Sequence, residues 1–131
     1  MDQGEEWGIS LKVGQTWGLT MANYYAFAAP ILPGQLDAWK SMVNEIKTTR
    51  KKEYESARKK LGIKHERAWL QHTPMGDFVV VYVEGKEPEK MLERFSASKD
   101  PFDQYFTKQI ASIHGLSGPP PPTNELYVDL L

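Results

Sequence analysis

The chain has 131 residues, enough for one domain with a single hydrophobic core. Its apolar fraction of 40% and charged fraction of 25% are those of a globular protein and exclude a wholly disordered chain. The formal net charge of −1 argues against a protein that coats nucleic acid or a membrane surface. The absence of cysteine excludes disulfides, cysteine-ligated metals and a thiol nucleophile.

Residues 1–20 differ in composition from the rest of the sequence. They are rich in glycine and contain three acidic residues against one lysine, the opposite of the charge of a secretory leader. No run of about 18 apolar residues occurs, so we expect a cytoplasmic protein without a membrane span. Two interpretations of residues 1–20 stand: a non-native N-terminal extension, or an extra strand. Residues 21–131 form the single predicted domain.

The first predicted elements of this domain are a strand and a long helix. Residues 23–30 are aromatic and small and end at a proline, which is typical of a strand. After the turn signal Leu32-Pro33-Gly34, apolar residues recur every three or four positions over 35–61, which predicts one continuous amphipathic helix. Gly62 ends this helix. Arg50 interrupts the apolar stripe, and we expect its head group to reach water or a nearby glutamate.

A hairpin follows the long helix. Residues 63–73 predict one strand, and Phe78-Val-Val-Val-Tyr-Val83 is the strongest strand pattern in the chain. The segment between them, Pro74-Met75-Gly76-Asp77, is a turn signal. Two strands joined by so short a loop form a hairpin.

Helical segments and a last strand complete the pattern. Pro88 starts one helix, and Asp100-Pro101-Phe102-Asp103 is typical of the N-cap and first turn of another helix, which Gly115 ends. Capping accounts for both carboxylates of this motif. After a proline-rich connector, alternating apolar residues predict a final strand at 124–131.

The element order β-α-β-β-α(α)-β predicts an α+β protein with the ferredoxin-like fold, a four-stranded antiparallel sheet with helices on one face. Aliphatic side chains of the hairpin suit the helix-covered face. The opposite face, termed the open face, then carries His65, Arg67, Trp69, Gln71, Phe78, Val80 and Tyr82. Because this apolar patch is large for a monomer, we expect a second copy to pack on it face to face, giving a dimeric barrel with a lined lumen.

Several stretches carry a resemblance: Leu32-Pro33-Gly34 before a helix with Trp39, the hairpin segments 69–77 and 79–84, Asp100-Pro-Phe-Asp103, and His114-Gly115. Over about residues 22–131 the chain resembles the dimeric α+β barrel superfamily, and within it small bacterial proteins with no firmly assigned activity. Other members of the superfamily are monooxygenases of antibiotic-biosynthesis type, haem-degrading enzymes, small isomerases and ligand-binding stress proteins. The resemblance therefore implies a fold and a homodimer rather than one activity.

The open face supplies the candidate ligand pocket. An aromatic plate beside polar groups suits a flat organic molecule, and the candidates are His65, Arg67, Trp69, Gln71, Phe78 and Tyr82. The competing interpretation places Trp69 in the dimer core and His65 in water at a strand end.

His65 and His114 are the candidate catalytic residues. His114, in the last turn of its helix, either caps carbonyl groups or acts as a proton donor or axial haem ligand. Haem is the one alternative to a cofactor-free protein, because haem-degrading barrels use a helix histidine near a tryptophan and an asparagine. Trp69 and Asn23 would fill those roles here. No His-x-His or His-Glu-x-x-His spacing occurs, so we expect no metal site.

Nine basic residues lie between Lys47 and Arg67, against three glutamates. Such a run either meets an anionic partner or forms a solvated face. No aromatic interleaving or groove-reading motif accompanies it, so we favour the solvated face and expect no nucleic-acid partner.

Three functions follow, in order of preference. The first is a dimeric barrel that binds a small organic ligand in its lumen, as a cofactor-independent monooxygenase or isomerase. The second is a non-catalytic ligand-binding or sensing module with the same barrel. The third is a structural or anion-binding protein that uses the basic helix face Lys47–Lys60.

Overall fold

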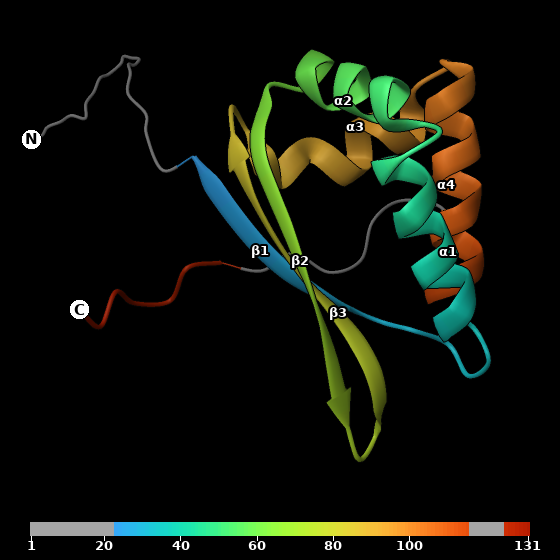
Figure 1. The fold of residues 1–131 in the computed structure, drawn as a ribbon. Helices are drawn as coiled ribbons and strands as arrows, with labels where there is room; N and C mark the ends of the chain where they lie inside the picture. Colours follow the sequence, from blue (N-terminus) through green and yellow to red (C-terminus); the bar gives the residue numbers. More distant parts are fainter. Residues whose placement is uncertain (1–22, 116–124) are drawn as a thin grey trace, which may run out of the picture.

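The computed structural model describes residues 23–115 and 125–131 (Figure 1). Three strands, β1 (Tyr24–Pro30), β2 (Ile63–Thr73) and β3 (Gly76–Gly85), form an antiparallel sheet in the order β1-β3-β2. One face of this sheet is covered by the helices α1 (Leu36–Lys47), α2 (Lys51–Lys60), α3 (Met91–Ala97) and α4 (Pro101–His114). A short 3-10 helix, η1 (Pro88–Lys90), leads into α3. The predicted α+β class is confirmed.

The strand order places β3 in the centre of the sheet. Its side chains alternate between the two faces, and Val79, Val81 and Val83 pack in the core under the helices. Val81 lies opposite Phe27 of β1 and Ala68 of β2, and all three side chains face the helices. β1 and β2 flank β3 as the first three strands of the ferredoxin-like motif do. None of the helices in the described ranges has the length and apolarity needed to cross a bilayer.

The predicted hairpin is confirmed, with the turn at Thr73–Gly76. Thr73 Oγ1 donates to the carbonyl of Gly76 at 2.7 Å and accepts from the backbone N–H of Met75 at 3.1 Å. Gly76 adopts a φ of 120°, which a residue with a side chain rarely adopts. These interactions set the register of β2 against β3.

The prediction of one continuous helix over 35–61 is wrong, because the helix breaks at Thr48–Arg50. The Thr48 hydroxyl donates to the carbonyl of Asn44 at 2.7 Å, and the Arg50 N–H bonds the carbonyl of Glu45 instead of an i−4 partner. A β-branched residue that bonds its own backbone favours such an irregularity. Figure 1 shows α1 and α2 turning sharply at this point, so that both remain over the sheet.

The Arg50 side chain stabilises the break through contacts with α2 and α4. Its guanidinium lies 3.9 Å from the centre of the Tyr105 ring on α4 and 3.2 Å from Glu53. Glu45 lies 3.7 Å from Arg50 and accepts a hydrogen bond from the Tyr105 hydroxyl. The expected salt bridge of Arg50 with a glutamate is confirmed, and it joins the α1–α2 junction to α4.

Both predicted ends of α4 are confirmed. Asp100 Oδ1 accepts hydrogen bonds from the backbone N–H groups of Phe102 at 2.9 Å and Asp103 at 3.4 Å. Gly115 closes the helix at a φ of 70°. Capping accounts for the Asp100 carboxylate, as expected, whereas Asp103 takes part in the cap through its backbone N–H and not through its carboxylate.

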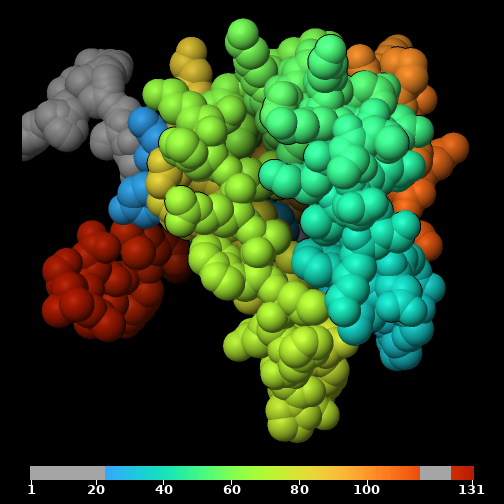
Figure 2. Space-filling model, in the orientation of Figure 1, coloured from blue at the N-terminus to red at the C-terminus, as the bar shows by residue number. Residues whose placement is uncertain are grey.

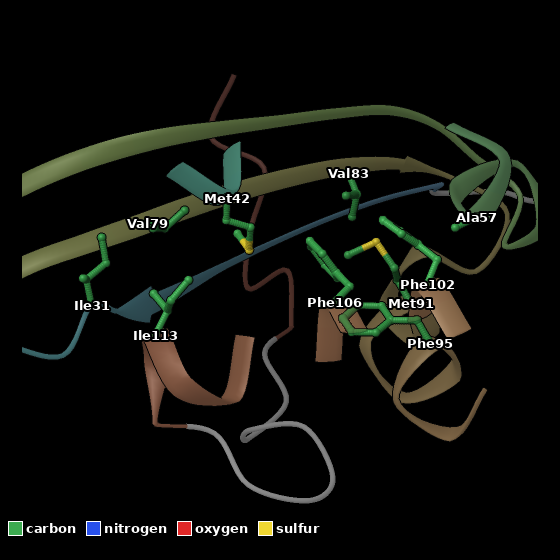
Figure 3. Close-up of a cluster of buried hydrophobic side chains, with 10 residues drawn as sticks. All are labelled: Ile31, Met42, Ala57, Val79, Val83, Met91, Phe95, Phe102, Phe106 and Ile113. Carbon is green, nitrogen blue, oxygen red and sulfur yellow. The ribbon is translucent and has the colours of Figure 1, made fainter. Parts of the chain in front are cut away.

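The core fills the layer between the helices and the sheet (Figure 3). At one end Val79 meets Ile31 and Ile113; at the other, Val83 meets the aromatic rings of α3 and α4. Phe95 and Phe106 pack edge to face, with ring centres 5.4 Å apart. Each buried side chain of this size contributes about 1.5–3 kcal/mol through removal from water.

The fourth predicted strand is not formed in the described part of the chain. Residues 125–131 have no regular secondary structure and are exposed, with Tyr127 at 92% and Leu130 at 84%. An isolated strand has no partner for its backbone groups, so alternation alone does not hold it in a sheet. Residues 1–20, the predicted extension or extra strand, and the proline-rich connector lie outside the described residues.

Candidate functional site

The open face of the sheet carries the side chains that the hairpin pattern assigned to it. Trp69 is 53% exposed on this face, whereas its neighbour in the sheet, Val79, points to the helices and is 3% exposed. The strand alternation of both hairpin strands is confirmed, because the aliphatic set Val79, Val81 and Val83 packs under the helices.

The register of β2 and β3 brings the candidate pocket residues together. Gln71 lies opposite Phe78, Trp69 opposite Val80, and Arg67 opposite Tyr82. Three consecutive same-face pairs therefore form one strip with apolar and polar side chains next to each other. Directly opposed side chains in such pairs are in contact distance. This strip can bind a flat apolar molecule on its aromatic side chains and hydrogen-bond the edge of that molecule through its polar side chains.

The strip extends onto β1 through a residue that sequence reasoning missed. Tyr24 is 48% exposed and stacks on Tyr82, with ring centres 6.5 Å apart and planes 22° from parallel. Tyr24 and Tyr25 are adjacent aromatic residues, and only the pairing of β1 with β3 shows which one faces outward. The sequence signal for this orientation is the alternation of large and small residues after Tyr24, which places Tyr25 and Phe27 on one face of the strand and Tyr24 on the other.

A tyrosine–glutamate pair stands at the end of this strip. The Tyr82 hydroxyl donates to Glu84 Oε2 at 2.5 Å. This hydrogen bond raises the pKa of Tyr82 because the charged phenolate would lose it. At neutral pH Tyr82 therefore stays a protonated phenol that donates to Glu84.

The two candidate catalytic histidines do not share a site. His65 is exposed near the start of β2, opposite Glu84 and next to an irregularity in the pairing at Ile63. His114 is buried on the helix side, where its Nδ1 donates to the carbonyl of Pro30 at 2.7 Å. Burial lowers the pKa of His114 below its ordinary value.

The alternative haem residues also lie apart. His114 bonds the last residue of β1, whereas Asn23 precedes the first residue of that strand, and Trp69 is on the opposite face of the sheet. This arrangement gives haem no common site at the three residues. The capping role expected of His114 takes a different form, because its acceptor is a strand carbonyl and not a carbonyl of its own helix.

The basic run is divided by ion pairs and by one buried member. Arg50 pairs with Glu53, Lys51 Nζ lies 3.9 Å from Glu55, and Lys60 Nζ lies 3.5 Å from Asp100. Arg58 differs from these surface residues, since it is 6% exposed and points into the protein. The interpretation of the whole run as a solvated face is therefore wrong for Arg58.

No protein-family model matches the chain, and comparisons with curated proteins and with solved structures find no match. Within residues 23–115 and 125–131, no group of three or more histidine, aspartate or glutamate side chains is arranged to hold a metal ion.

Proposed function

We propose that the protein is a homodimer that binds a small, flat organic molecule between two open faces. The observation that carries this proposal is the exposed aromatic strip, where Trp69 is 53% exposed beside stacked Tyr24 and Tyr82. Aromatic rings left in water on the face of a sheet gain free energy when a ligand or a partner covers them.

The second copy is favoured because the strip complements itself. In a two-fold interface each aromatic row meets the same row of its partner, and the lumen between the rows is lined by Arg67 and Gln71 as well as by rings. Two sheets packed in this way form the dimeric α+β barrel that the sequence resembles.

The exposed C-terminal segment supports the same assembly. Residues 125–131 lie on the side of the sheet opposite to the helices in Figure 1, with Leu126 at 62% and Val128 at 51% exposure. We propose that this segment becomes the fourth strand of the ferredoxin-like sheet when the dimer closes, which would bury its alternating apolar side chains.

Ligand binding is the primary function in this proposal. Experiment decides whether the protein also converts the bound ligand. The Tyr82–Glu84 pair at the end of the strip supplies polar groups that a bound ligand could use for proton transfer. A cofactor-independent monooxygenase would consume oxygen with its ligand, an isomerase would convert the ligand without oxygen, and a sensing module would release it unchanged.

Native mass spectrometry tests the assembly. The unaltered chain should give twice the mass of one chain, and any added mass identifies a retained ligand. Trp69→Lys places a charge in the proposed interface and should give the single-chain mass, with its circular dichroism spectrum unchanged because Trp69 is exposed. Met75→Lys is the matched control, since Met75 is 88% exposed in the hairpin turn. A monomeric unaltered chain, or a dimeric Trp69→Lys variant, would overturn the proposal.

Ligand binding is tested with 2-naphthol, a flat neutral aromatic molecule that fluoresces. We expect binding to the unaltered chain and to Met75→Lys, and none to Trp69→Lys. Equal binding by all three proteins would place the ligand elsewhere and would remove the open face as the binding site.

A further inference from the structure

A cleft lies on the other face of the sheet, between the helices and β2. The helix break leaves a hollow there, which Figure 2 shows between α1 and β2 with β1 at its floor. Its inner chamber, of about 100 Å³, is lined mainly by apolar side chains. An outer groove of about 530 Å³ leads to the surface. Trp39, Ile46, Tyr54, Arg58 and Ala68 line both, so groove and chamber are continuous.

Arg58 stands where the groove meets the chamber with an unused hydrogen-bond donor. Its side chain is 7% exposed, and its Nε donates to Glu66 Oε1 at 2.8 Å. Its Nη1 is buried and has no hydrogen-bond partner among the described residues. A buried N–H of a charged group without an acceptor is unfavourable, and native structures satisfy nearly all such donors. The structure therefore has a buried donor for which residues 23–115 and 125–131 supply no acceptor.

The surroundings hold this guanidinium in one orientation. It packs against the rings of Tyr54, Phe106 and Phe95, at 4.5, 5.0 and 5.2 Å from their centres. The Tyr54 hydroxyl donates to the same Glu66 oxygen that Arg58 bonds. Because Glu66 occupies Nε, the buried Nη1 donors remain for a further acceptor.

The charge of the groove selects an anion. Lys47, Lys51, Lys59 and Lys64 line the groove together with Arg67, against the acidic side chains Glu55 and Glu66. Lys51 is paired with Glu55 at 3.9 Å, a distance at which an exposed pair is weak. An excess of positive charge at the mouth raises the local concentration of small anions.

We propose that this cleft binds a small aromatic monocarboxylate, with one carboxylate oxygen on Arg58 Nη1 and the ring in the apolar chamber. A carboxylate is the acceptor that an arginine N–H bonds best. The chamber and the start of the groove together offer an apolar space for one six-membered ring, and an apolar cavity of about 150 Å³ takes up benzene. The chamber and the open face lie on opposite faces of the sheet, and Arg67 on the edge strand β2 borders both the groove and the open face.

Isothermal titration with benzoate tests the ligand class, and benzamide is the neutral control of equal shape. Benzoate should bind about tenfold more tightly than benzamide, the ratio expected for a hydrogen bond between charged partners. Benzoate should also shift the Nε–H signal of Arg58 in an ¹⁵N spectrum of the guanidinium groups. Benzoate that binds no better than benzamide, or that leaves this signal unchanged, would overturn the proposal; buried water would then satisfy Arg58.

Two variants place the binding site. Arg58→Lys should lose most benzoate affinity, whereas Arg50→Lys, the same exchange at a surface ion pair, should keep it.

Arg58 also supports the fold, so Ala68→Phe provides a second variant that fills the passage and leaves the guanidinium in place. Ala97→Phe, at the exposed end of α3, is its control. Full affinity in Ala68→Phe would refute this location. Trp69→Lys should bind benzoate normally, which separates failure of this site from failure of the open face.

Discussion

Arg58 on α2 and Glu66 on β2 are joined by a contact of 2.8 Å between Nε and Oε1, inside the layer between helices and sheet. Such a pair adds little stability compared with two apolar residues, but removing one partner leaves a buried charge without compensation. Glu66 also accepts the hydrogen bond of Tyr54, so one carboxylate holds two side chains of α2 against the edge strand.

Glu66→Gln should therefore destabilise the protein by about 3 kcal/mol, because Arg58 would stay buried and charged without its counter-ion. Urea denaturation measures this loss. Glu53→Gln is the control, since Glu53 is an exposed partner of Arg50 and its replacement should change the free energy of unfolding by less than about 0.5 kcal/mol. Equal losses in the two variants would show that the Arg58–Glu66 pair is not electrostatically buried.

The two faces of the hairpin could be predicted from the sequence because strand side chains alternate whatever the rest of the fold does. Trp69 and Val80 therefore lie on the expected face, and the caps at Asp100 and Gly115 lie where local hydrogen bonding requires them. Each of these features depends on neighbours within a few residues.

The helix break and the burial of Arg58 depend on residues far apart in the sequence. The segment Thr48–Arg50 contains no proline or glycine that would mark a helix end, and the break is held by Tyr105 of α4. Arg58 stands among lysines, and its burial requires the acceptor Glu66. One signal was available: Glu66 shares its strand face with apolar Leu70, so a glutamate under the helices needed a cationic partner.

The N-cap of α4 should make stability depend on pH in the acid range. The hydrogen bond from the Phe102 N–H, at 2.9 Å, is the main cause that lowers the pKa of Asp100. A lowered pKa means that the cap stabilises the fold fully above the unfolded value of about 3.9 and is lost as pH falls through the folded value.

Asp100→Ala should accordingly lower the melting temperature at neutral pH, and its difference from the unaltered chain should shrink below about pH 4. Asp100→Asn keeps a capping oxygen without a charge and should lose less. Thermal melts across this pH range measure the effect. A difference that is constant with pH would contradict the role of the charge.

His114 should make stability depend on pH in the same direction as Asp100, but nearer to neutral pH. Burial lowers its folded pKa below the unfolded value of about 6.5, so the unfolded chain takes up a proton that the folded chain refuses. Stability should fall as pH drops from about 7.5 to about 5.5. His114→Gln should show a smaller fall, whereas His65→Gln, at an exposed position, should keep it. Denaturant melts at the two pH values measure this fall in stability. If the fall is the same in the unaltered chain and in both variants, His114 is not the group responsible.

Gly85 is required where the end of β3 meets the start of β2. A Cβ at this position would lie 2.2 Å from the carbonyl oxygen of Gly62 and 2.8 Å from the Cα of Ile63, and backbone cannot move aside as a flexible side chain can. Gly85→Ala should therefore open this end of the hairpin and speed hydrogen exchange at the Lys86 amide, which donates to Gly62 at 3.0 Å. Gly34→Ala is the control, because its Cβ meets open space and only the φ of 81° is strained, at about 1–2 kcal/mol. Gly85→Ala should lose more stability than this control, and a smaller loss would mean that the strand ends separate without consequence for the sheet.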